Sequence, residues 1–182
     1  MKALTSALAF LLAVAALSAA ESRTEIVKAT TPADDAKGLD PAVPDVYATE
    51  GRFERVVVLR FKHQADLLAG LERMVKEKNI KNAVILSAIG SVRSYHYHTV
   101  SNRTFPSKNL FVKNTEASAD IIGMSGYVID GVLHPHITFS DPNHSFGGHL
   151  EAGTSVFTFA AVTIGVLADG VDLKRLDDKT YR

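Results

Sequence analysis

The chain has 182 residues, of which 46% are hydrophobic, 8% aromatic and 22% charged, a composition that excludes a largely disordered or fibrous protein. Lys and Arg together number 20, as do Asp and Glu, so the chain lacks the basic excess typical of nucleic-acid-binding domains. Cysteine is absent, which excludes disulfides, thiolate metal sites and a cysteine nucleophile.

The first 20 residues have the pattern of a secretory signal peptide. Lys2 supplies a positive start, residues 3–16 are almost wholly apolar, and the small residues Ser18 and Ala20 mark a cleavage site. The apolar run is short for a membrane anchor and has no basic flank that would stop transfer. We therefore expect cleavage after Ala20 and a secreted or periplasmic product without a membrane span.

Residues 21–50 are expected to form an acidic linker. They contain Pro32, Pro41 and Pro44, and no apolar periodicity persists along them. A short strand within residues 43–48 is the alternative for part of this segment. The folded domain is expected over residues 51–170, followed by a polar C-terminal tail over residues 171–182.

One amphipathic helix and several strands are expected in the domain. Asp66 suits the N-cap position, and apolar residues recur at helical spacing over residues 67–75. Asp130-Gly131 is a strong hairpin signal, and Gly90 is expected to end a strand. Apolar and β-branched runs predict strands over residues 55–61, 83–89, 92–100, 109–112, 117–129, 132–139 and 156–167. The pattern predicts an α+β domain, with a mostly antiparallel sheet and one main helix.

Three of the seven histidines are candidate metal ligands. His134 and His136 alternate along one predicted strand, so their side chains share a face. The glycines at 147 and 148 would let the chain turn back closely and bring His149 beside them. Three neutral imidazoles with an open fourth position suit a divalent ion, zinc above all. The alternative is that these histidines are half-buried and hydrogen-bond their neighbours.

His96 and His98 form a second alternating pair. The carboxylate that a cupin metal motif requires after such a pair is missing, because Asn102 and Arg103 stand at those positions. We therefore expect this pair to line a pocket or to lie at an interface.

An ordered set of motifs resembles the PPC (plant and prokaryote conserved) domain of bacterial proteins. The motifs are the strand at residues 122–128, Asp130-Gly131, His134-Pro135-His136, Ser140-Asp141 and Gly147-Gly148-His149-Leu150. The resemblance covers about residues 55–167, and it implies a curved antiparallel sheet with a helix, usually assembled as a homotrimer. It also implies, as in some prokaryotic members, a metal held at the positions of His134, His136 and His149. Pro135 departs from the aliphatic residue usual between the two histidines.

Three functions follow as alternatives. The first is an exported PPC-domain protein with a three-histidine site for a metal or a small ligand. The second is a DNA-associated regulatory protein, which the neutral charge and the predicted export disfavour. The third is a metal-dependent hydrolase, for which the candidate general bases are His96, His98, Glu116 and Glu151.

Assembly is expected to use the face of the sheet that the helix does not cover. One helix covers one face, so the other needs a partner, and the resemblance points to three-fold closure. Candidate contacts are His63, Tyr95, Tyr97 and the strand over residues 156–167.

Overall fold

The computed structural model describes residues 23–24, 41–103 and 106–177. The predicted signal peptide and most of the predicted linker lie outside the described residues. Residues 41–50 are described and contain turns but no strand, so the short strand considered over residues 43–48 is not formed.

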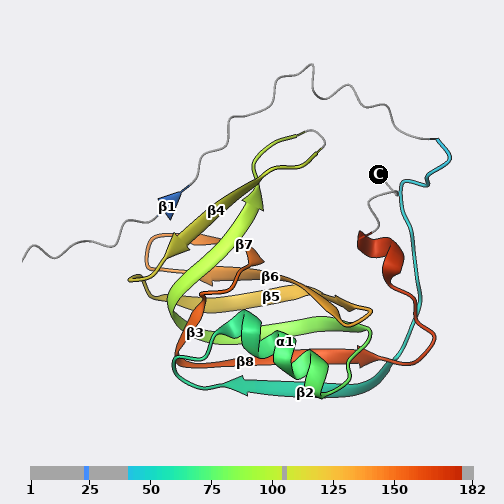
Figure 1. Cartoon of the computed structure of the whole chain (residues 1–182), viewed down its shortest axis with the longest axis horizontal. Helices are drawn as coiled ribbons and strands as arrows, with labels where there is room; N and C mark the ends of the chain where they lie inside the picture. Colours follow the sequence, from blue (N-terminus) through green and yellow to red (C-terminus); the bar gives the residue numbers. More distant parts are fainter. Residues whose placement is uncertain (1–22, 25–40, 104–105, 178–182) are drawn as a thin grey trace, which may run out of the picture.

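A mostly antiparallel sheet and one α-helix make up the described chain (Figure 1), which confirms the α+β class. The helix is α1 (Leu67–Glu77), and a short 3-10 helix, η2, spans Lys174–Asp177. The strands are β1 (Arg23–Thr24), β2 (Phe53–Phe61), β3 (Ala83–Val100), β4 (Asn109–Asn114), β5 (Ala119–Ile129), β6 (Val132–Ser140), β7 (Ser145–Leu150) and β8 (Ser155–Leu167).

Strand β3 runs through Gly90, where the sequence predicted a strand end. Gly90 has a φ of 141°, and a Cβ at this position would lie 2.3 Å from the carbonyl oxygen of Phe159 on β8. The glycine therefore allows β3 to bulge closely against β8 and to continue. The two strands predicted over residues 83–89 and 92–100 are one strand of 18 residues.

A change of partners along β3 closes part of the sheet on itself. The first half of β3 pairs with β8 and β5, and the second half pairs with β4 and β7. Because β5, β6 and β7 are neighbours in that order, these three strands and β3 form a closed ring. Tyr95, Tyr97, Phe139 and Phe146 pack against one another in the core. Tyr97 is buried, so it belongs to the core rather than to an outer contact surface.

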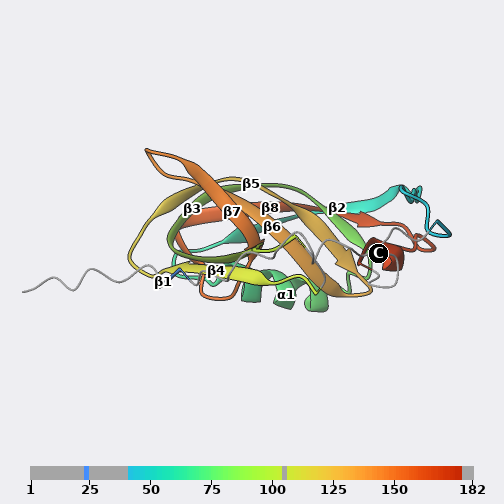
Figure 2. The ribbon, with the colours of Figure 1, turned by 90° about the horizontal axis from the view of Figure 1, so that it is seen from above.

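Helix α1 begins at the predicted N-cap and is tied to the sheet there. One Asp66 carboxylate oxygen accepts a hydrogen bond from the Ala69 backbone N–H at 2.9 Å, and the other accepts from the Gly153 N–H at 2.6 Å. The helix lies on one side of the curved sheet (Figure 2). Its buried face carries Leu67, Gly70, Leu71 and Val75.

Apolar side chains are exposed on four neighbouring strands. They alternate with core residues, so they point away from the core. We call these residues the apolar band: Val56 and Val58 on β2, Leu86 and Ile89 on β3, Ile122 on β5, and Phe157 and Phe159 on β8.

The chain beyond β8 is anchored to the domain by a buried side chain and a hydrogen bond. Leu173 is buried, and the Asn82 side-chain amide donates a hydrogen bond to the Val171 carbonyl oxygen at 2.8 Å. Helix η2 follows this anchor, within the segment expected to be a polar tail. No helix in the described ranges is long and apolar enough to span a membrane.

Candidate metal centre

Strand β6 presents His134 and His136 side by side, as expected from their alternation. Their Nε2 atoms form a hydrogen bond 3.3 Å long, and their rings stack with centroids separated by 5.3 Å. Pro135 between them is fully buried and faces Gly126 on β5. The pairing of β6 with β7 begins only at His136, so the proline lies beyond the end of that ladder, where a missing N–H is tolerated.

Strand β7 places His149 between histidines from two other strands. His149 is directly opposite His98 on β3 and directly opposite His136 on β6. Side chains that are directly opposite across strands lie on the same face, which explains why residues so distant in sequence meet. The centroid of the His149 ring is 4.6 Å from that of His98, 5.0 Å from that of His134 and 5.5 Å from that of His136. We call these four residues the histidine cluster.

The glycine pair before His149 is what allows β7 to lie so close to its neighbours. A Cβ on Gly147 would be 2.0 Å from the Ile137 carbonyl oxygen of β6, and a Cβ on Gly148 would be 2.2 Å from the His98 carbonyl oxygen of β3. Any side chain at either position would therefore displace a neighbouring strand.

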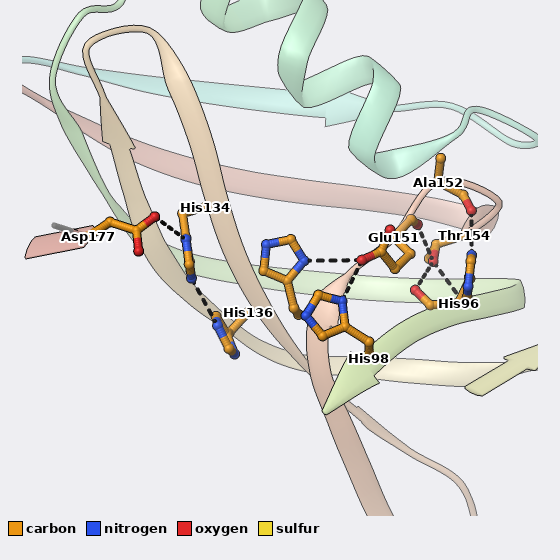
Figure 3. A network of polar contacts seen from close by, with 9 residues as sticks. His96, His98, His134, His136, Glu151, Ala152, Thr154 and Asp177 are labelled. Carbon is orange, nitrogen blue, oxygen red and sulfur yellow. Dashed lines mark hydrogen bonds and ion pairs between the residues drawn. The ribbon is translucent and has the colours of Figure 1, made fainter. Parts of the chain in front are cut away.

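Glu151 adds a carboxylate to the histidine cluster. Its Oε1 accepts a hydrogen bond from His98 Nδ1 at 2.5 Å and lies 3.5 Å from His149 Nδ1 (Figure 3). One donor atom each of His98, His149 and Glu151 lies within 4.8 Å of the other two, so this group could hold a metal ion. Imidazole and carboxylate donors are those that zinc and neighbouring transition metals accept.

One buried nitrogen in this group lacks a hydrogen bond. His149 Nδ1 is inaccessible to solvent and has no hydrogen-bond partner, and its contact with Glu151 is too long to be one. A buried polar atom without a partner is destabilising by about 1–3 kcal/mol. A bound cation would give this nitrogen a partner, so the unpaired Nδ1 fits a metal-binding centre.

The surroundings of His136 and His149 lower the pKa of both side chains and so favour the neutral imidazole, the form that binds metals. Desolvation is the main cause that lowers the pKa of His136, and the neighbouring His134 and His98 lower it further. Desolvation also lowers the pKa of His149, as do the neighbouring histidines, against the opposing effect of Glu151.

A cavity of about 380 Å³ adjoins the histidine cluster. Its polar lining consists of Ser125, Tyr127, His134, His136 and Asp177, and its other walls are mainly apolar. His96 and His98, expected to line a pocket, are not among its lining residues.

The candidate general bases lie at different places. His98 and Glu151 belong to the centre, whereas His96 Nδ1 is 2.8 Å from the Ala152 carbonyl oxygen (Figure 3). Glu116 is exposed in the turn after β4, where its backbone N–H donates to Asn114.

The sequence points to Glu151 and His98 as candidate general bases, but it predicts neither as a close partner of His149, and it does not predict Asp177 at the site. A signal for Glu151 was present, since it stands two residues after His149, at the spacing that returns a side chain to the same face. Asp177 carried no such signal, because its carboxylate reaches His134 Nδ1, at 3.4 Å, only through the path of the C-terminal segment.

Solved structures from archaea share the fold. A metal-containing protein from Archaeoglobus fulgidus is 25% identical with a TM-score of 0.58, and the match covers 68% of this chain and 86% of that one. A plant- and prokaryote-conserved (PPC) protein from Pyrococcus horikoshii is 20% identical with a TM-score of 0.54, and the match covers 68% of this chain and 85% of that one.

Among curated proteins, the chain is similar to the bifunctional protein GlmU of a Synechococcus strain. The two are 28% identical over 121 residues, which make up 66% of this chain but only 18% of that relative.

The profile of the Plants and Prokaryotes Conserved (PCC) domain matches residues 48–168. The match takes in α1 and every strand from β2 to β8, together with the histidine cluster and Glu151. Asp177 lies beyond it. The chain belongs to the Plants and Prokaryotes Conserved domain family, the PPC family that its ordered motifs resemble.

Proposed function

We propose that this chain is an exported protein whose histidine cluster holds a divalent metal ion, zinc above all. His134, His136 and His149 bind the ion, and Glu151, beside His98, supplies the fourth donor. The proposed export rests on the signal-peptide pattern of residues 1–20.

The convergence of donors around an orphaned nitrogen carries this proposal. Histidines that serve only the fold would hydrogen-bond their neighbours, yet the buried Nδ1 of His149 has no such bond. The His149 ring lies beside the rings of His98, His134 and His136 from two other strands, and Glu151 supplies negative charge beside its Nδ1. An ion bound there would satisfy the nitrogen and offset the carboxylate.

The lowered pKa values of His136 and His149 also support the proposal. Both imidazoles stay neutral at pH 7, so an ion need not displace a proton from them. The hydrogen-bonded His98 and Glu151 pair is different, because an ion that took His98 Nδ1 would replace the proton there. The metal-containing protein from Archaeoglobus fulgidus, which has the same fold, adds a precedent.

Elemental analysis and zinc titration test the proposal. The chain from residue 21 onward, purified without chelators, is expected to contain about one transition-metal ion per molecule. His149→Ala is expected to weaken zinc binding at pH 7.5 by at least about 100-fold, more than the loss of an outer-shell group does. His98→Ala and Glu151→Gln are expected to weaken it to a smaller extent.

His144→Ala is the matched control. This ring is 62% exposed and contacts Asp141 rather than the histidine cluster. Zinc affinity should therefore be unchanged. A wild-type protein that carries no metal and binds no zinc at pH 7.5 would rule out the proposed centre.

A further inference from the structure

We propose that Asp177 is a positioning residue of the metal centre, which orients the His134 imidazole so that its Nε2 lone pair faces the ion. The inference rests on the proposed metal site and concerns a residue outside the range that matches the family. It assigns a role to the C-terminal segment, which family membership does not explain.

The two ring nitrogens of His134 face different groups. Nδ1 lies 3.4 Å from Asp177 Oδ2, and Nε2 lies 3.3 Å from His136 Nε2 (Figure 3). A neutral imidazole carries one proton, and a carboxylate beside Nδ1 favours that proton on Nδ1. The contact is longer than a normal hydrogen bond, but its electrostatic preference is the same. Nε2 is then left as a bare lone pair directed at His136.

The distance between the two Nε2 atoms suits a shared ion. Zinc–nitrogen bonds are about 2.0–2.1 Å long, so two tetrahedral ligand atoms are separated by about 3.3–3.4 Å. The observed 3.3 Å between His134 Nε2 and His136 Nε2 has this value. Metal-binding histidines commonly donate their other N–H to a carboxylate, which fixes the tautomer and raises the basicity of the ligand atom. Asp177 stands where such a carboxylate is needed.

The C-terminal segment is anchored so that Asp177 stays in this place. Buried Leu173 holds the segment against the domain just before η2. The Lys174 backbone N–H donates to Asp172 at 2.9 Å. The Lys174 ammonium also lies 3.9 Å from an Asp130 carboxylate oxygen in the β5–β6 turn, but both side chains are exposed, so this pair adds little to the anchor. Leu176 and Asp177 then form part of the wall of the cavity beside His134 and His136.

Zinc affinity and the tautomer of His134 test this role separately. Asp177→Ala is expected to raise the dissociation constant for zinc alone by about 10- to 100-fold at pH 7.5. Asp177→Glu should recover part of the loss. In the metal-free protein, nitrogen NMR of labelled histidine should show the proton of His134 on Nδ1, and Asp177→Ala should shift the population toward Nε2–H.

Asp130→Asn is the matched control. It removes a carboxylate that contacts the same C-terminal segment but no histidine, and asparagine suits the positive φ of this turn residue. Zinc affinity and the tautomer should both be unchanged. If the wild type binds zinc and Asp177→Ala alters neither readout, the positioning role is wrong while the metal site stands. If the wild type binds no zinc, the proposed function fails, and the tautomer shift alone decides whether Asp177 orients His134.

Discussion

At the scale of single residues, the surroundings of His136 and His149 disfavour protonation of these two side chains. His136 and His149 have lowered pKa values because they are partly desolvated and because a charge on one imidazole disfavours a charge on its neighbours. The lowered pKa values shift the protonation of His136 and His149 to a lower pH but do not prevent it. They also keep lone pairs available for a metal at a pH where free histidine begins to take up protons.

The metal-free protein should lose stability as the pH falls from 7.5 to 5.5. In the unfolded chain these two histidines regain an ordinary pKa near 6.5, so below that pH the unfolded state binds more protons than the folded state. Their contribution to stability is complete above pH 6.5 and is lost as the pH falls through the lower folded-state values. Urea unfolding across this range measures the effect.

The same pH series on variants locates its origin. His136→Ala should flatten the pH dependence, whereas His144→Ala should retain most of it because His144 lies outside the cluster. A metal-free wild type with the same free energy of unfolding at pH 7.5 and pH 5.5 would contradict the prediction.

Which residues come together at the site is only partly predictable from the sequence. A period of two places His134 and His136 on one face, and this required no knowledge of the fold. The approach of His98 was not predictable, because it depends on β7 pairing with the distal half of β3. Local spacing carries information about one strand, but not about which distant strand becomes its neighbour.

At the scale of elements, β7 supplies His149 at the centre of the histidine cluster, although its sequence has little strand character. Its sequence contains two glycines and has little β-branched character, so strand propensity is low. Pairing with β3 on one side and with β6 on the other holds it in place. The helix and the Asp130-Gly131 hairpin, by contrast, depend on short-range capping and turn chemistry, and the sequence predicted both. The prediction that a strand ends at Gly90 is wrong. A glycine can end a strand, but it can also let a continuous strand lie very close to its neighbour, as β3 does against β8.

Gly148→Ala tests the role of β7 directly. The new Cβ would meet the His98 carbonyl oxygen at 2.2 Å, so β7 and β3 must separate. We expect a loss of about 1–3 kcal/mol in the free energy of unfolding, and weaker zinc binding because His149 moves away from His98. Thermal denaturation and zinc titration measure the two effects.

Gly123→Ala serves as the control for this substitution. A Cβ at Gly123 would have no atom within 4 Å, so both stability and zinc affinity should stay close to wild type. Equal effects of the two substitutions would show that the close packing of β7 does not matter for the site.

At the scale of the whole molecule, the first expectation concerns export. The chain should lose residues 1–20 on secretion, because Ser18 and Ala20 offer the small residues that signal peptidase reads. N-terminal sequencing of the protein recovered from the periplasm or medium should start within a residue or two of Glu21. Ala20→Asp, which places a charge at the cleavage position, should block processing. Recovery of the full-length chain from the cytosol alone would contradict export.

The exposed apolar band is the surface on which we expect another chain to pack. Its residues lie on β2, β8, β3 and β5, which are successive neighbours in the sheet, so the band runs continuously across this face. Soluble monomers seldom expose an apolar patch of this kind. His63 borders the band, with its ring 6.0 Å from that of Phe157. Around a three-fold axis the bands of three copies would face one another, each copy contacting both neighbours, and the resemblance to PPC domains implies this closure.

The mature protein is therefore expected to be a homotrimer. Light scattering coupled to size exclusion should give about three times the chain mass at micromolar concentration. Phe157→Asp should shift the protein toward the monomer, since it places a charge in the band while its outward position spares the core. Val132→Asp is the control, because Val132 is 69% exposed at the β5–β6 turn, outside the band. A wild-type monomer would refute the assembly, and a stable dimer would retain the covered face but contradict three-fold closure.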